Sequence, residues 1–186
     1  MGKSGAFGLL VAAAFLLAGC EFVREESVPA VETNKQAGGC PGAAVLAEAS
    51  TVTKFRGAGR DPTDVVATAE IARPKLSCDY DNDTRQVELT LSFPLSIKRG
   101  PAGNDADVTV SYFVAVVDSD NNVVLKQGFD RDLAPDMASA GFDENPGRIS
   151  FTAAKDKKAV SYEVLVGFQL SHDELAYNRT QRRFVP

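Results

Sequence analysis

Two short runs of aspartate and asparagine have the oxygen-rich composition of a calcium-binding loop. Residues 79–83 read Asp-Tyr-Asp-Asn-Asp, and residues 118–122 read Asp-Ser-Asp-Asn-Asn. An EF-hand loop also needs glycine at its sixth position and glutamate at its twelfth. The first run has threonine at both positions, and the second has Val123 and Phe129. Because Asp and Asn also favour tight turns between strands, we interpret both runs as turns.

Three consecutive residues, Ser171, His172 and Asp173, have the types of a hydrolase triad. Adjacent residues cannot form the chain of hydrogen bonds between converging side chains that a triad requires. Ser171 and Glu174 instead form the Ser-x-x-Glu pattern of a capping box, which starts a helix. We therefore predict a short helix after Ser171, with His172 exposed in its first turn. His172 is the only histidine in the chain, which argues against a histidine-based metal site. The sequence predicts no metal, no cofactor and no catalytic residue.

Arginines occur at two places that could contact an anionic partner. Arg56 and Arg60 flank a loop with two glycines, which lacks the further glycines and the strand–loop–helix context of a phosphate-binding motif. Arg179, Arg182 and Arg183 make the C-terminal end basic within an acidic protein. Each segment can be an ordinary solvated surface. The alternative is contact with an acidic partner or, at the C-terminal end, with anionic lipid headgroups.

The first twenty residues have the organisation of a secretory signal. Lys3 precedes an apolar run over residues 6–17, and small residues lead to Cys20. This order of charge, apolar core and small residues is typical of a signal peptide. The run is shorter than the roughly 20 residues that span a bilayer. The Leu-Ala-Gly-Cys sequence that ends at Cys20 resembles the bacterial lipobox. That resemblance implies cleavage before Cys20 and acylation of its thiol.

The lipobox resemblance implies a protein held at a membrane surface outside the cytoplasm. A single acyl chain binds a membrane only marginally, and stable anchoring takes a second signal; lipoproteins of this type carry two or three chains. In proteins with this signal, aspartate after the lipidated cysteine favours the inner membrane, and here Glu21 and Phe22 follow. We therefore expect the outer membrane, with the protein facing the periplasm.

Removal of residues 1–19 as a signal peptide leaves 167 of the 186 residues, a length that suits one domain. The net charge goes from −5 to −6, because Lys3 is the one charged side chain lost. An acidic chain is a poor nucleic-acid binder, since phosphate contacts need clustered Lys and Arg. Residues 20–39 are polar and end in Gly-Gly, so we expect a lipidated N-terminus and a flexible tether. Residues 40–186 are expected to form a single domain.

Cys40 and Cys78 remain once Cys20 carries lipid. Disulfides persist in the oxidising periplasm, so we predict a bridge between these two residues. On the chain-entropy estimate it contributes about 4 kcal/mol to stability. Two free thiols or a metal pair are the alternatives.

The rest of the chain has the alternation of half-buried strands. In residues 87–98 six apolar residues alternate with polar ones or Pro94, and residues 160–170 alternate similarly. Pro94 lacks the N–H that a central strand donates, so we expect this strand to lie at an edge or to be bulged there. Residues 108–117 are apolar on both faces after the start of the segment, which indicates a central strand. Residues 123–129 should pair back on it across a turn.

About seven strands separated by turn clusters predict an all-β protein, an immunoglobulin/fibronectin-like β-sandwich with a short C-terminal helical turn. A different sandwich or a partial barrel is the alternative. The further strands are expected at residues 64–73, 75–81 and 148–152. The conformation of residues 43–63 stays open, because helical spacing of the apolar residues competes with β-branched ones. Residues 130–147 are expected to be a long, functional or mobile loop.

Three stretches, residues 40–78, 111–118 and 164–179, resemble a group of uncharacterised bacterial envelope lipoproteins. More loosely, a lipidated cysteine, a short tether and a Cys-Pro segment are similar to accessory lipoproteins of the outer-membrane β-barrel assembly machinery. In those proteins an extended segment near the N-terminus docks on a partner lipoprotein. The resemblance implies that residues 40–73 are the docking segment here.

These observations favour a non-enzymatic function, in which a disulfide-stapled sandwich binds another envelope protein. One alternative is a carrier for a small or lipidic molecule, which predicts an apolar pocket between the sheets. The other is a hydrolase of envelope polymers, which predicts converging carboxylates or an activated nucleophile in a cleft. No carboxylate pair is singled out by the sequence.

Overall fold

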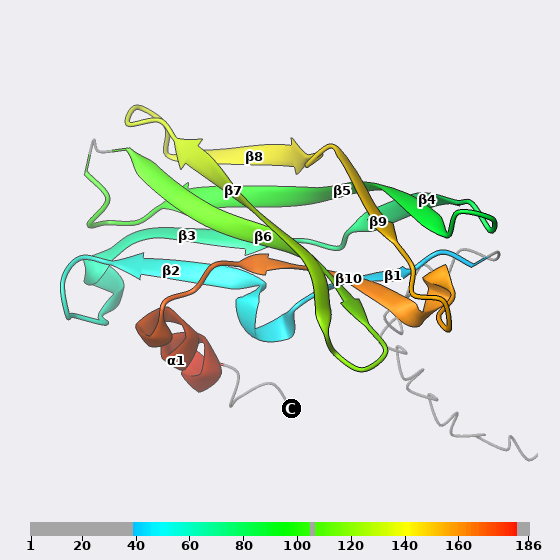
Figure 1. Ribbon diagram of the computed structural model, residues 1–186. Helices are drawn as coiled ribbons and strands as arrows, with labels where there is room; N and C mark the ends of the chain where they lie inside the picture. Colours follow the sequence, from blue (N-terminus) through cyan, green and yellow to red (C-terminus); the bar gives the residue numbers. More distant parts are fainter. Residues whose placement is uncertain (1–38, 105–106, 182–186) are drawn as a thin grey trace, which may run out of the picture. The chain divides into compact units, whose positions relative to one another are not determined.

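Two β-sheets make up most of the computed structural model, which describes residues 39–104 and 107–181 (Figure 1). Sheet 1 has four strands in the order β1–β10–β6–β7. Their bounds are Gly42–Val45 for β1, Tyr162–Phe168 for β10, Val108–Asp118 for β6 and Val123–Leu133 for β7. β1 runs parallel to β10, and the other pairs are antiparallel. The predicted all-β sandwich with a C-terminal helical segment is confirmed.

Sheet 2 is built around the long strand β5 (Gln86–Arg99). The first half of β5 pairs with β4 (Lys75–Tyr80) and β9 (Arg148–Thr152). Its second half pairs with β3 (Val65–Ile71) and β8 (Ser139–Glu144), and β2 (Thr51–Phe55) adds to β3. β5 therefore holds sheet 2 together along its whole length.

Alternate residues of the long strands fill the space between the sheets. β5 contributes six side chains, of which none is more than 2% exposed, as its alternation predicts. They meet inward side chains of β6 and β10, and these face the same core. The largest fully buried core residues are Tyr112, Phe93, Phe168, Leu89, Leu91, Leu95, Ile97, Leu133 and Ile149. Side chains of this packed core thus occupy the intersheet position that the carrier hypothesis assigned to a pocket.

Pro94 lies in a central strand, so the prediction of an edge position is wrong. The strands on either side of β5 break next to it. β3 ends opposite Leu95 and β4 begins opposite Ser92, while β8 ends opposite Phe93 and β9 begins opposite Thr90. The Pro94 carbonyl accepts a hydrogen bond from the Ala72 N–H, so the Pro94 nitrogen faces the gap between β3 and β4. Its missing N–H is therefore accommodated without placing β5 at an edge.

The described residues contain ten strands, more than the seven or so predicted from the sequence. The predicted loop at residues 130–147 is wrong, because β7 continues to Leu133 and β8 occupies Ser139–Glu144. The segment after Cys40, whose conformation the sequence leaves undetermined, contains β1, a short 3₁₀ helix η1 (Ala47–Ala49) and β2. Residues 40–73, the docking segment implied by resemblance, therefore supply strands to both sheets.

Helix α1 (His172–Gln181) follows β10 and packs beside β2 and η1 (Figure 1). Its predicted capping box is present, with the Ser171 N–H donating to Glu174 at 2.7 Å and the Glu174 N–H donating to Ser171 Oγ at 3.2 Å. The buried Asn178 amide donates to the carbonyls of Glu48 and Thr51 at 2.9 and 2.8 Å. The helix is thus attached to the segment between β1 and β2.

Candidate binding surface

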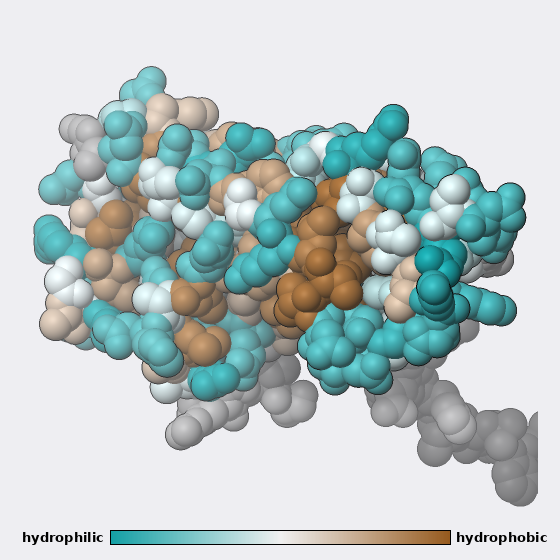
Figure 2. Space-filling model, viewed as in Figure 1, coloured by the Kyte–Doolittle hydropathy of each residue, from teal (hydrophilic) through white to brown (hydrophobic). Residues whose placement is uncertain are grey.

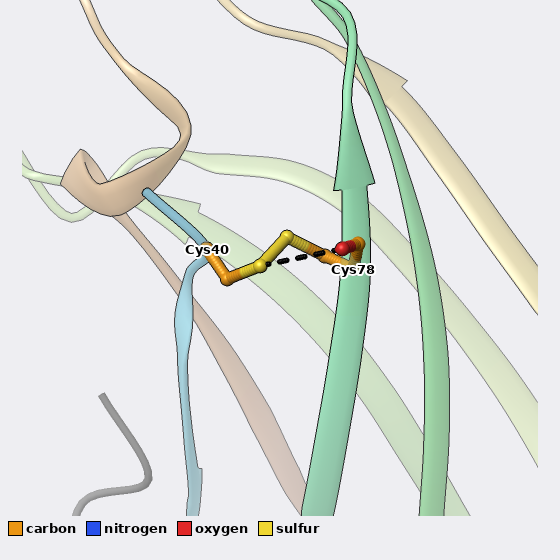
Figure 3. Close-up of a disulfide and its surroundings, with 2 residues drawn as sticks. All are labelled: Cys40 and Cys78. Atoms are coloured by element: carbon orange, nitrogen blue, oxygen red, sulfur yellow. Dashed lines mark hydrogen bonds between the residues drawn. A yellow bond between two sulfur atoms is a disulfide. The ribbon is translucent and has the colours of Figure 1, made fainter. Parts of the chain in front are cut away.

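The disulfide between Cys40 and Cys78 joins the two sheets where the chain enters the described domain (Figure 3). Cys40 lies two residues before β1 of sheet 1, and Cys78 lies within β4 of sheet 2; their Cα atoms are 5.8 Å apart. The predicted bridge is therefore confirmed. Cys20, the predicted lipidation site, lies outside the described residues.

The two aspartate runs form turns, as predicted. Asp118 Oδ1 accepts hydrogen bonds from the N–H groups of Asp120 and Asn122, both at 2.9 Å. The Lys157 ammonium lies between two carboxylates, 2.7 Å from Asp118 and 2.6 Å from Asp120. The hydrogen bond from Lys157 holds the pKa of Asp118 well below its usual range. The Lys157 ammonium thus occupies the position between the two carboxylates that a calcium ion would need.

Asp81 closes the other turn in the same manner. Its Oδ1 accepts from the backbone N–H groups of Asp83 and Thr84, at 2.8 and 3.1 Å. Both hydrogen bonds lower the pKa of Asp81, and the bond from Thr84 has the larger effect. Throughout residues 39–104 and 107–181, no three His, Cys, Asp or Glu side chains come together as a metal site. Over the same ranges the helices are too short or too polar to cross a bilayer.

The predicted contact arginines are separated by the fold. Arg56 is exposed on the β2–β3 loop. Arg60, on the same loop, lies 5.0 Å over the Phe55 ring and 3.5 Å from Asp173 at the start of α1. Arg179 forms a bidentate pair with Glu48, at 2.9 to 3.2 Å. Arg60 and Arg179 are therefore engaged within the domain. Arg182 and Arg183 lie outside the described part of the chain.

A buried polar cluster, which the sequence did not reveal, connects the sheets. Glu144 of β8 is 1% exposed and accepts a hydrogen bond from the Tyr112 hydroxyl of β6 at 2.6 Å. Arg131 of β7 donates to both oxygens of the same carboxylate. Burial raises the pKa of Glu144, but the bonds from Arg131 and Tyr112 outweigh it and lower the pKa overall. Both oxygens of the Glu144 carboxylate accept hydrogen bonds, and the carboxylate is buried. The cluster is therefore a structural link between the sheets.

The outer face of sheet 1 carries a cluster of apolar residues beside polar ones such as Lys126, Asp130 and Glu163. Val114 and Val116 of β6 point into the core, so Phe113, Ala115 and Val117 point outward. By register, Leu165 of β10 and Ala44 of β1 lie on the same outer face. At the β7 edge Val123 and Val124 are 59% and 47% exposed. Figure 2 shows a hydrophobic patch over the region of β6, β7 and β10.

A groove of about 560 Å³ crosses this face between sheet 1 and the η1–α1 side. Leu46 and Leu175 line it from that side, and Phe113 and Lys126 line it from the sheet. Leu46 is 38% exposed, and the Lys126 ammonium lies 4.4 Å over the Phe113 ring. Since monomeric domains seldom leave a contiguous apolar surface uncovered, we identify this groove and the outer face of sheet 1 as the candidate binding surface.

The sequence contained a signal for this surface. Residues 112–117 are apolar at every position, which is typical of a central strand but also predicts a second apolar face. Searches with the whole chain match no family model, and they find no similar curated protein. The candidate binding surface therefore rests on the sequence and geometry of this chain alone.

Proposed function

We propose that this protein is a lipid-anchored, non-catalytic binding module of the bacterial envelope, which faces the periplasm and holds a partner protein. The lipobox resemblance at Cys20 supports the anchor and the location. The resemblance to accessory lipoproteins of outer-membrane assembly supports a role beside a larger envelope complex.

The observation that carries the proposal is the candidate binding surface, on which the apolar residues Leu46, Val123 and Val124 are exposed. These three residues are not among the residues of the core between the sheets. Burying apolar area contributes about 25 cal/mol per Å², and interface cores are richer in apolar residues than the rest of the surface. A partner protein that covers this face therefore accounts for its composition.

Affinity purification of the lipidated protein from solubilised membranes tests this proposal. The wild type is compared with a double variant, Leu46→Asp with Val123→Asp, which places charges on the candidate binding surface. Met137→Asp is the matched control, because Met137 is 43% exposed but lies in the turn between β7 and β8. We expect a stoichiometric partner with the wild type and the control, and at least a tenfold loss with the double variant. Recovery of the wild type alone, or equal recovery with all three proteins, contradicts the proposal.

A carrier for a small lipidic molecule is the second candidate, because the groove volume lies in the range of ligand pockets. Native mass spectrometry of the purified protein separates the two functions. A carrier retains an acyl-containing small molecule, and Leu46→Asp releases it. A protein-binding module is recovered without such a ligand.

A further inference from the structure

Strand β7 is a long edge strand of sheet 1. It contains eleven residues, and within the described residues its only ladder partner is β6. A typical strand has about five or six residues. The side of β7 that faces away from β6 therefore presents a row of backbone groups that can pair with another strand.

Backbone geometry identifies which groups of β7 face outward from the sheet edge. The Gln169 N–H donates to the Ser111 carbonyl at 2.8 Å, so the backbone groups of Ser111 point toward the β10 side. Ser111 lies opposite Asp130 in β7, and these two residues form a pair without mutual hydrogen bonds. Since this pattern alternates, the N–H and C=O groups of Asp130, Gly128 and Lys126 point away from β6. All three residues are exposed.

The charges at these three positions are arranged symmetrically about Gly128. Lys126 precedes it by two residues and Asp130 follows it by two, so opposite charges lie at equal distances from the glycine. If a second copy of β7 pairs antiparallel with Gly128 opposite Gly128, each Lys126 lies opposite Asp130 of the other copy. A two-fold contact requires a surface that complements itself. A segment of another protein needs no such symmetry, so the arrangement points to a second copy of this chain.

Both charged side chains contact β6 and keep their charge for a second copy. The Lys126 ammonium lies 4.4 Å over the Phe113 ring, which carries no charge. The Ser111 hydroxyl donates to Oδ1 of Asp130 and leaves Oδ2, and a carboxylate accepts at both oxygens. The ion pairs formed within residues 39–104 and 107–181 include neither Lys126 nor Asp130. The two contacts therefore hold the side chains on the outer face of sheet 1 without neutralising them.

Apolar side chains on this side of the sandwich are only partly covered. Leu125 and Phe129 of β7 pack against the core but are half-buried. Phe142 of β8 is half-buried as well, and Arg131 of β7 lies 5.8 Å over its ring, so the edges of the two sheets meet here. In the two-fold pairing, Arg131 of the second copy lies opposite Leu125, and its Gln127 lies opposite Phe129. A second copy thus also covers the rim of the core along β7.

We propose that this protein forms a two-fold dimer in which β7 pairs antiparallel with β7 of a second copy, with Gly128 at the axis. Backbone hydrogen bonds at Lys126, Gly128 and Asp130 join the two copies of sheet 1 into one continuous sheet, and the two Lys126–Asp130 pairs fix its register. Directly opposite residues share a face of a sheet, so the candidate binding surfaces of both copies lie on the same side. The dimer goes beyond the proposed function and does not depend on a partner protein.

Sedimentation equilibrium of the purified full-length protein, in a detergent whose density is matched by the solvent, tests the dimer. The wild type should show a monomer–dimer equilibrium. Lys126→Asp places carboxylates opposite each other at two positions and should raise the dissociation constant of the dimer about tenfold. The double variant Lys126→Asp with Asp130→Lys exchanges the charges and should restore the wild-type value. Lys98→Asp is the control, because Lys98 is exposed on β5 of sheet 2, and it should leave the equilibrium unchanged.

Cysteine cross-linking tests the position of the axis. Gly128→Cys places two thiols across the two-fold axis, where paired Cα atoms lie about 5.5 Å apart, a separation that a disulfide can bridge. The atom nearest to the added Cβ is Nε2 of Gln169, at the end of a flexible side chain. Gly141→Cys in the exposed part of β8 is the control, because an added Cβ there meets nothing within 4 Å. After mild oxidation, Gly128→Cys should run as a covalent dimer on a non-reducing gel and Gly141→Cys as a monomer.

Three results would overturn the dimer. They are a wild type that stays monomeric, a double variant that associates no more tightly than Lys126→Asp, and equal cross-linking of Gly128→Cys and Gly141→Cys. A monomeric protein can still recover a partner from membranes, and a dimeric one can recover none, so this proposal and the proposed function fail separately.

Discussion

The Tyr112 hydroxyl of β6 donates a hydrogen bond of 2.6 Å to Glu144 of β8 and so links sheet 1 to sheet 2 inside the core. Tyr112 also packs edge-on against Phe93 and stacks on Phe129, with ring centroids 5.4 and 5.2 Å apart. Burial is the main cause that raises the pKa of Tyr112, and the hydrogen bond to Glu144 raises it further. The bond fixes the position of one sheet relative to the other, because a buried carboxylate must keep its donors.

Glu144 makes the stability of the domain sensitive to acid. Its pKa is lower in the folded protein than in the unfolded chain, where it is about 4.3. A lowered pKa stabilises the fold above the unfolded value, and this contribution is lost as pH falls through the folded value. Glu144→Gln should therefore cost about 2–3 kcal/mol at pH 7. The deficit relative to the wild type should shrink at a pH below the folded pKa, as measured by urea denaturation.

Arg131→Met provides the control for this prediction. It keeps the aliphatic part of the side chain but removes the cation, which is 44% exposed and lies 5.8 Å from the Phe142 ring. Burial then raises the pKa of Glu144, so this variant should also be least stable, relative to the wild type, at neutral pH. A deficit that is independent of pH in both variants would show that the charge of Glu144 does not stabilise the fold.

The attachment of helix α1 depends on one buried amide. Asn178→Ala removes two hydrogen bonds and leaves the Glu48 and Thr51 carbonyls without them, which should cost about 2 kcal/mol. Phe55 and Tyr177, whose rings meet at 4.9 Å, would still pack. We expect faster hydrogen exchange at the Leu175 amide, which donates to Ser171. Thr180→Ala is the control, because its hydroxyl bonds only within the helix at Tyr177. Unchanged exchange in Asn178→Ala would place the attachment elsewhere.

The parts of the fold that the sequence predicted are those with a strict pattern. β5 alternates because one face of it is buried along its whole length. β6 is apolar from Tyr112 to Val117, where most of its residues are buried. The capping box was predictable because it depends on two residues only three positions apart. Cys40 and Cys78 were predictable by elimination once Cys20 was assigned to lipid.

The missed parts depend on partners that are distant in the sequence. β8 reads Ser-Ala-Gly-Phe-Asp-Glu, which has weak strand propensity, and it forms because β5 offers a free edge. Glu144 looks like a surface residue, and only the fold brings Tyr112 and Arg131 to it. The sequence around Pro94 indicated an edge strand, because the gap that accommodates this proline lies between two other strands, β3 and β4. The groove also escaped prediction, since it needs Leu46 and Leu175, 129 positions apart, on one face.

Acylation at Cys20 remains a prediction of the sequence and has a direct test. In cells given radiolabelled palmitate, the wild type should incorporate label and sediment with the membranes. Cys20→Ala should lose the label and leave the membrane fraction. The double variant Cys40→Ser with Cys78→Ser is the control, and it should still be labelled. Label in Cys20→Ala, or none in the wild type, would refute a lipid anchor at this residue.

The Cys40–Cys78 bridge should protect the shortest strand of sheet 1 from a pull on the chain that precedes Cys40. β1 has four residues and, within residues 39–104 and 107–181, pairs only with β10, so tension applied before Cys40 would peel it away. The disulfide instead passes the tension to β4, which is paired to the central strand β5. The bridge also stabilises the fold by about 4 kcal/mol on the chain-entropy estimate.

Single-molecule stretching between the N- and C-terminal ends measures this effect. The variant Cys40→Ser with Cys78→Ser should open at a lower force than the wild type, beginning with release of β1. It should also extend further on complete unfolding, by about 130 Å, because the intact bridge retains the chain over a sequence separation of 38 residues. The wild type under a reducing agent should behave like the variant, and the variant itself should not respond to the agent. An equal first opening force with and without the bridge would show that tension does not pass through β4.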